Sequence, residues 1–272
     1  MGRSRLMWFG ILAAMVFAAR GASAQAVGAA FGQKGQVAIS AERLLGVYVL
    51  DAEAEHDGTS TGFGPGGPIP VARKTENNST TFALLGSGAS VGPAAIPRLA
   101  VDFFVIDQLS IGGSLLYWSD STESETTGTN TVGGTPDPID RDRTETDTHV
   151  VGFSPRVGYA YMFSPTFGIW PRGGFSYVNQ KTESKNENID AGNGTVDTTD
   201  TEVKTSVFSL TLEGLLIISP FEHLAFGVGP FFEWGFAGDI ETEISSPPAL
   251  LQTEGDLNTT TFGITSSLIA WF

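Results

Sequence analysis

Short turns and long polar segments alternate along this sequence, and that alternation limits the folds open to it. Residues 106–108, 164–166 and 219–222 form short connections within pairs of apolar-rich segments. Much longer segments, rich in Thr, Asp, Glu, Asn and Gly, join one pair to the next. A β-sandwich with Greek-key connections has no reason to alternate in this way. An up-and-down barrel does, because its two ends carry connections of different length.

The apolar-rich segments show the period of two residues that is typical of strands with one apolar face. They predict an all-β chain of eight antiparallel strands, joined by four long loops and three short turns. The predicted strands are residues 36–50, 97–105, 109–119, 155–163, 167–179, 207–218, 224–236 and 258–272. The predicted loops are residues 51–80, 120–148, 181–201 and 238–257, which lack apolar periodicity.

Residues 81–91 fit more than one interpretation. They could extend the second strand, belong to the loop before it, or form a ninth strand. Bacterial barrels have an even number of strands, which places both chain ends on the same side of the membrane. We therefore assign these residues to the second strand or to its loop.

The first 24 residues have the features of a secretory signal. Arg3 and Arg5 precede an apolar run of about 14 residues, which is too short to span a membrane. The small residues at 22–24 predict cleavage before Gln25. We expect residues 25–35 to form a short tail, with no regular structure over residues 26–34, and residues 36–272 to form the barrel. Loss of the three signal arginines takes the formal net charge from −15 to −18, which argues against a nucleic-acid partner.

The sequence contains no cysteine, which excludes a lipid anchor on cysteine and a disulfide framework. Prolines raise a difficulty for a closed barrel, because each one removes a hydrogen bond from a ladder unless it lies at a bulge. Four prolines fall within the predicted strands: Pro97, Pro155, Pro171 and Pro230.

The last predicted strand ends the sequence on an aromatic residue. Its apolar face consists of Phe262, Ile264, Leu268, Ala270 and Phe272. This strand resembles the closing strand of bacterial outer-membrane β-barrels, whose terminal Phe is part of the signal read by the insertion machinery. We therefore interpret Phe272, Ala270 and Leu268 as a C-terminal insertion signal.

The whole pattern resembles the small OmpA/OmpX-like barrels of the Gram-negative envelope. The resemblance covers nearly the whole mature chain and is architectural: the alternation, the loop lengths and the terminal Phe. It implies an outer-membrane location, contacts with outer-membrane lipids and lipopolysaccharide, and recognition by the insertion machinery during assembly. It resolves no subfamily, and we expect a monomer.

Charged residues in the predicted strands should point into the lumen, because a charge at the bilayer midplane on the lipid face costs about 2–4 kcal/mol. Glu42 and Arg43 are neighbours, so one of them is expected to face outward near an interface. An eight-stranded barrel is just wide enough for side chains to fill it. We predict one ion-pair network that closes the lumen, with a gated pore as the alternative. Its members are Arg98, Asp102, Arg156, Arg172, Glu213, Glu233 and Glu42.

Aromatic residues are predicted to form two levels at the membrane interfaces. The external level consists of Tyr117, Trp118, Tyr177, Trp234 and Phe236. The periplasmic level consists of Phe163, Phe167, Trp170, Phe221, Trp271 and Phe272.

The three histidines give no pattern for catalysis. His149 lies near Asp147 at the external rim, but Val151 stands where barrel lipid hydrolases carry the serine of their His-x-Ser pattern. His56 lies in the first loop and His223 in a periplasmic turn. The acidic runs at residues 137–142 and 190–197 lack the spacing of the twelve-residue calcium loop. We predict no enzyme activity, no cofactor and no metal site.

These patterns together predict a single-domain outer-membrane barrel with a structural or surface-exposed role. The alternative is a narrow channel or transporter for small or hydrophobic solutes. A lateral opening in the wall, or apolar lumen residues, would favour that alternative. A lipid-modifying enzyme is the third hypothesis, and it needs a His, a hydroxyl and an acid converging at one rim.

Overall fold

The computed structural model describes most of the chain as long antiparallel strands. The described residues are 30–61, 69–84, 95–128, 131–132, 135–136, 140–190, 195–246 and 249–272. The strands are β1 (Val37–Thr61), β2 (Ile69–Leu84), β3 (Arg98–Ile106), β4 (Leu109–Gly128), β5 (Thr131–Val132), β6 (Thr135–Pro136), β7 (Asp140–Tyr159), β8 (Tyr161–Met162), β9 (Phe167–Asp190), β10 (Thr195–Phe221), β11 (Leu224–Ser246) and β12 (Ala249–Trp271). Within the described ranges, no helix has the length and apolar character needed to cross a membrane.

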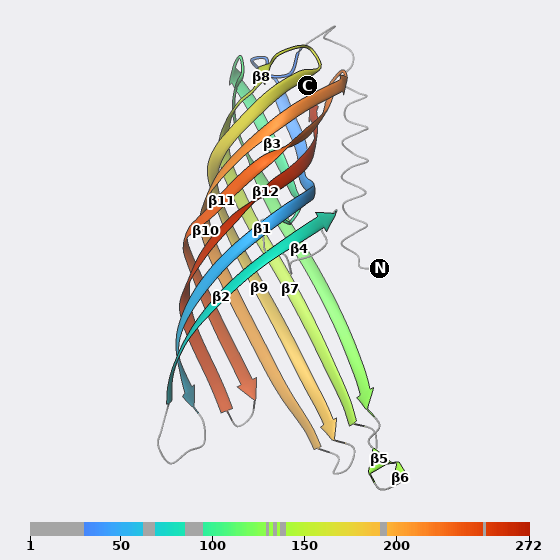
Figure 1. The fold of residues 1–272 in the computed structure, drawn as a ribbon, viewed down its shortest axis with the longest axis vertical. Coiled ribbons are helices and arrows are strands. Elements are labelled where there is room, and N and C mark those ends of the chain that lie inside the picture. The colour runs from blue at the N-terminus through green and yellow to red at the C-terminus, as the bar shows by residue number, and fades with distance from the viewer. Residues whose placement is uncertain are drawn as a thin grey trace.

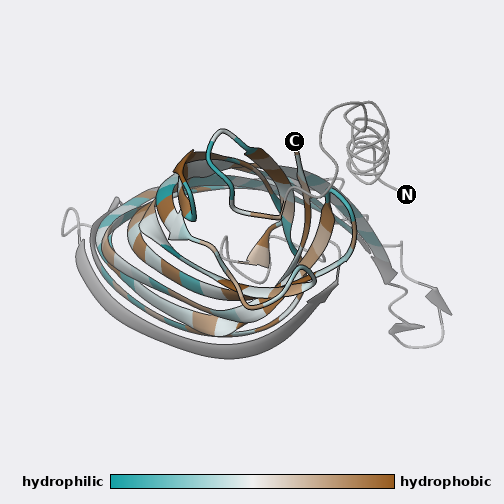
Figure 2. Ribbon diagram, turned by 90° about the horizontal axis from the view of Figure 1, so that it is seen from above, coloured by the Kyte–Doolittle hydropathy of each residue, from teal (hydrophilic) through white to brown (hydrophobic). Residues whose placement is uncertain are grey.

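Eight of these strands close into a ring, which confirms the predicted fold (Figures 1 and 2). The order around the ring is β1, β3, β4, β7, β9, β10, β11 and β12, and β12 pairs with β1 from Trp271 opposite Ala38 to Leu250 opposite Thr61. Closure leaves the membrane-spanning part of the ring without a free edge. The short connections and the C-terminus lie at one end, which we call the turn end, and the long strand pairs extend from the other, the extended end (Figure 1).

The segments predicted as long loops are largely strands, so this prediction is wrong. For example, residues 120–148 were expected to be a loop, but β4 continues to Gly128 and β7 starts at Asp140. The prediction relied on apolar periodicity, which exists only where one strand face contacts lipid or a core. In the extended end both faces are polar, while the ladder of backbone hydrogen bonds continues through Thr-rich segments that favour strands.

The outer surface carries an apolar band around the ring. Its exposed members include Leu115, Phe153, Phe175, Phe226 and Ile264. The intervening residues face the lumen, as alternation along a transmembrane barrel strand requires, and they are polar or charged at its centre and aromatic or aliphatic on either side. This band identifies the fold as a transmembrane β-barrel.

Three tryptophans assigned to the interface levels face the lumen instead. Trp118, Trp170 and Trp271 are buried inside the ring, whereas Trp234 lies on the outer surface as predicted. Trp170 lies two residues before Arg172 on the same strand, so both side chains share the inward face. Closeness to a strand end therefore does not determine whether a side chain faces the lumen or the outer surface.

The second place in the ring is shared by two strands. β3 pairs with residues 37–42 of β1, and β2 pairs with residues 45–60 of β1 on the same side. Residues 81–84 therefore extend the second strand position, as one interpretation of that segment held, while residues 85–91 lie outside the described part of the chain.

The strand prolines fit without bulges. Pro155, Pro171 and Pro230 each have a register partner on one neighbouring strand only, and the register continues unchanged on both sides of the interruption. Pro97 precedes β3. The ladder is therefore locally interrupted on one side of each proline, at the place of its missing N–H donor.

Candidate functional site

A β-bulge near the start of β1 shapes the centre of the lumen. Residues 43–45 lie opposite the single residue Ser266, and Arg43 has a φ of 57°. The Ser266 hydroxyl accepts a hydrogen bond from the Leu45 N–H at 3.0 Å and donates one to the Leu45 carbonyl at 3.2 Å. The bulge turns two consecutive side chains inward, and Glu42 and Arg43 are only 3% and 1% exposed. The expectation that one of them faces outward is therefore wrong.

Arg156 from β7 is the central donor of the lumen. Its guanidinium donates to both carboxylate oxygens of Glu42, from Nη1 at 2.7 Å and from Nη2 at 2.8 Å. Its Nε also donates to Oδ1 of Asp102 at 3.1 Å. All three side chains are buried. Charged hydrogen bonds between a planar guanidinium and carboxylates are strong, and the planar group fixes their geometry.

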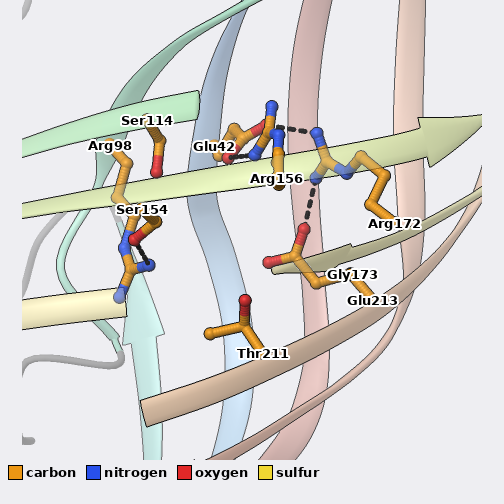
Figure 3. Close-up of a pocket in the computed structure, with 9 residues that line it drawn as sticks. All are labelled: Glu42, Arg98, Ser114, Ser154, Arg156, Arg172, Gly173, Thr211 and Glu213. Carbon is orange, nitrogen blue, oxygen red and sulfur yellow. Dashed lines mark hydrogen bonds and ion pairs between the residues drawn. The ribbon is translucent and has the colours of Figure 1, made fainter. Parts of the chain in front are cut away.

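Arg172 from β9 links this centre to the opposite wall (Figure 3). It donates to Oε1 of Glu42 and to Oε2 of Glu213, each at 2.5 Å. Its guanidinium also lies 4.7 Å from the ring centroid of Trp170, within cation–π range. Strands on different sides of the ring are thereby joined through one side chain.

A second group extends the network. Arg43 donates to Glu233 at 3.1 Å and lies 3.5 Å from Glu213. Arg98 lies 3.6 Å from Glu233 and donates to the Ser154 hydroxyl at 3.2 Å. Four arginines and four carboxylates thus face one another, so their formal charges cancel.

The structure brings together all seven residues that the sequence assigned to this network. It adds Arg43, which the sequence analysis left undecided. One signal could have found it: two adjacent opposite charges in an apolar strand can both face inward only at a bulge. We call these eight residues the lumen network.

The lumen network leaves almost no free space. A cavity of about 10 Å³ lies among Glu42, Arg98, Arg156, Arg172 and Glu213. A single water molecule needs at least that much probe-occupied volume. The centre of the barrel is therefore packed with side chains, as its diameter allows.

An aromatic plug lies between the lumen network and the turn end. Phe31, from the segment before β1, contacts Phe104, Trp170 and Trp271 edge to face, with ring centroids 5.3, 5.1 and 5.2 Å away. The Gln36 side-chain oxygen holds this segment by accepting from the N–H groups of Gly32 and Gln33. The tail was expected to lack ordered structure, and residues 30–34 correct that expectation. The plug is Phe31, Phe104, Trp170 and Trp271.

An apolar layer lies on the other side of the lumen network, toward the extended end. Leu116, Trp118, Val150 and Val178 face inward from three consecutive strands, and Ile96 packs against them from the segment before β3. Tyr48, Ala95 and Phe231 form a smaller cluster beside it. The lumen therefore has three layers along its axis: aromatic, charged and apolar.

The predicted insertion signal lies on the closing strand. Leu268 and Ala270 occupy the positions of β12 that alternate with the inward Ile269, and Phe272 exchanges backbone hydrogen bonds with Val37 at 3.0 and 3.1 Å. The role of these residues in assembly stays a prediction.

The described histidines are held in different ways. The His149 Nδ1 lies 3.1 Å from the Ser119 hydroxyl across the β4–β7 pair, and both groups are on the outer face. The His223 Nδ1 lies 2.9 Å from the carbonyl of Trp271, which ties the β10–β11 turn to the closing strand. The side chain of His56 lies outside the described residues.

Comparison with known proteins gives structural similarity only. No protein-family model matches the chain, and no curated protein matches it. The crystal structure of the outer membrane protease OmpT from Escherichia coli is 10% identical, with a TM-score of 0.40, covering 92% of this chain and 100% of that one. The outer membrane protein OprG from Pseudomonas aeruginosa is 12% identical, with a TM-score of 0.43, covering 88% and 97%. Ail, the attachment invasion locus protein of Yersinia pestis, is 10% identical, with a TM-score of 0.29, covering 87% and 99%.

These three structures are of bacterial outer-membrane proteins, of which one is a protease and another an attachment invasion locus protein. Scores this low carry no argument about activity. The barrel itself rests on the strand pairing and the apolar band of this chain.

Proposed function

We propose that this protein is an outer-membrane barrel with a structural or surface-exposed role and a lumen closed to solutes. The observation that carries the proposal is the lumen network, in which eight charges pair across the barrel axis, seven of them buried and Glu213 with a side chain only 9% exposed. The plug supports it with a second barrier at the turn end. A narrow polar channel needs a continuous water-filled path, and these two layers stand across it.

The orientation belongs to the same proposal. The turn end faces the periplasm and the extended end faces the outside, as in other bacterial barrels with short periplasmic turns. The extended end then presents polar, acidic strand pairs at the cell surface, where lipopolysaccharide and other envelope components are its contacts. The barrel reaches the membrane through a cleaved signal, is inserted by the outer-membrane assembly machinery, and functions as a monomer.

Single cysteines test the location and orientation, because the native chain contains none. Ser124→Cys places a thiol on the extended end, and Glu222→Cys places one in the turn between β10 and β11, both at exposed positions. On intact cells, a membrane-impermeant maleimide should label the first variant and leave the second unlabelled. Labelling only at position 222 would reverse the orientation, and labelling of neither in intact cells would contradict surface exposure.

Heat treatment tests the barrel in the same extracts. Folded barrels resist detergent at room temperature, so unboiled and boiled samples should migrate differently on a gel. Release of the protein into the periplasmic fraction, with no shift on boiling, would overturn the location.

A further inference from the structure

The barrel wall has a seam toward the extended end. Among the described residues, β2 pairs only with β1, and β4 pairs with β3 only as far as Leu115. Beyond Leu115, the described part of β4 pairs only with β7. The facing edges of β2 and β4 are therefore unpaired in the described part of the chain, and the two strands diverge in Figure 1.

The seam begins at the border of the apolar band that faces the extended end. Leu115 and Tyr117 on β4 point outward and are exposed, and the next outward residue, Ser119, is polar. Unpaired strand edges are not tolerated within hydrocarbon, but they are tolerated where water and lipid headgroups can reach them. The described edges of the seam thus lie at the membrane interface, at the depth where aromatic side chains and lipid ester groups lie.

The apolar layer lies directly behind this seam. Leu116 and Trp118 belong to β4, the strand that forms one edge of the seam, and alternate there with the outward Leu115 and Tyr117. Val150 and Val178 continue the layer onto the next two strands of the ring. The layer is packed by Ile96 in this structure, and its apolar wall would match an apolar chain in the place of that side chain.

A buried donor in this layer lacks an acceptor. The Trp118 side chain is only 7% exposed, and its Nε1–H has no hydrogen-bond partner among the described atoms. A buried indole N–H usually donates a hydrogen bond, because a buried donor without an acceptor costs free energy. The occupant of the layer should therefore carry a hydrogen-bond acceptor close to an apolar chain.

We propose that the seam between β2 and β4 admits an acyl chain of an outer-leaflet lipid into the apolar layer. The chain packs against Leu116, Val150 and Val178, and the ester carbonyl accepts the Trp118 Nε1–H. Ile96 now packs in this layer and moves aside when the chain enters. The site is separated from the turn end by the lumen network and the plug, so it is a lipid-binding site in the wall and not a route through the barrel.

Quenching of tryptophan fluorescence by brominated lipids tests the proposal, because bromine quenches only rings that lie close to it. Three variants each keep one tryptophan, at position 118, 170 or 234, with the others changed to Phe. In bilayers of phosphatidylcholine brominated near the headgroup, the outward Trp234 is the positive control and the buried Trp170 the negative control. Trp118 should be quenched several-fold more than Trp170 and close to the level of Trp234.

Substitutions of Ile96 give the matched series. Ile96→Ala should raise the quenching of Trp118 because it frees space for the chain, and Ile96→Phe should lower it. If the single-tryptophan chains do not fold, Trp118→Phe in the otherwise native chain should reduce the quenched fraction of the total fluorescence. Trp118 as protected as Trp170, with no response to Ile96→Ala, would overturn the proposal. Quenching by acrylamide in water but not by brominated lipid would overturn it as well.

Discussion

Two regions of this barrel carry most of its strand charges. The charges are shielded from solvent in one region and accessible to solvent in the other. The lumen network holds four arginines and four carboxylates, directly paired and all buried except the slightly exposed Glu213. The outer face of the extended end holds an excess of acids, which are exposed or half-buried. On one side of it, ion pairs such as Arg143 with Glu123 stay accessible, with the arginine side chain 41% exposed. On the other side, Asp239 lies opposite Asp256, and Glu241 lies opposite Glu254.

The difference shows that burial determines how much an ion pair matters for the stability of the barrel. In the lumen, an unpaired charge would remain in a low dielectric, so removing one partner is costly. At the surface, water and salt screen both partners, so the same contact contributes little. Even directly opposed acids, which disfavour strand pairing, are tolerated there. The lumen network can therefore define one barrel structure, while the surface charges are free to vary.

The largest effect is expected from Arg156→Met. It would remove from the barrel centre a guanidinium that donates hydrogen bonds to Glu42 and Asp102, which should reduce the free energy of unfolding by about 3–5 kcal/mol. Urea titration followed by tryptophan fluorescence measures this loss. Arg156→Lys should recover part of it, because lysine keeps the charge but cannot bond both carboxylates in a planar fork. A loss no greater than that of an exposed lysine would contradict the account.

Phe31→Ala should weaken the plug. Truncation of a buried Phe typically costs about 3–5 kcal/mol, and we expect the lower part of that range because the surrounding rings can close partly. The same urea titration measures it, and Phe31→Leu should lose less. Native stability in Phe31→Ala would mean that the segment before β1 does not hold the turn end closed.

Ser266→Ala tests the bulge that turns Glu42 and Arg43 inward. It removes two hydrogen bonds to Leu45, so a loss of about 1 kcal/mol is expected. Ser266→Thr keeps the hydroxyl and serves as the control. A larger loss, close to that of Arg156→Met, would show that the bulge collapses and releases the charges with it.

The smallest effect is expected at the surface. Lys185 donates to Glu187 at 2.6 Å, and this bond lowers the pKa of Glu187. A carboxyl group whose pKa is lowered in the folded state stabilises that state at pH values above its ordinary pKa. This stabilisation is lost as the pH falls through the lowered pKa. Because both groups are solvent-exposed, Lys185→Met should leave the urea midpoint unchanged at neutral pH and in high salt. A clear loss there would remove the contrast between the two regions.

Residue-level physics explains which features could be predicted from the sequence. The cost of charge in lipid pointed charged strand residues into the lumen, which located seven members of the lumen network, but it did not resolve the first strand, where Glu42 and Arg43 are neighbours. The same alternation, applied to Trp170 and Trp118, would have placed both inward, but their closeness to strand ends was given more weight. The inward position of the Arg43 side chain depends on a β-bulge, and residue periodicity does not predict a bulge.

Other features depend on contacts between distant parts of the chain. Phe31 lies in a short segment without periodicity, and its three ring partners come from β3, β9 and β12. The strand extensions have polar residues on both faces, so apolar periodicity cannot reveal them. Thr-rich composition was the available signal, and it was interpreted as typical of loops.

Planar-bilayer recording tests most directly whether the lumen is closed. The native protein should show no conductance steps at moderate voltage. A variant that combines Phe31→Ala with Arg156→Ala and Arg172→Ala should conduct, because it removes the plug and the centre of the lumen network together. Stable channels from the native protein, at a conductance that the triple variant does not exceed, would contradict the account.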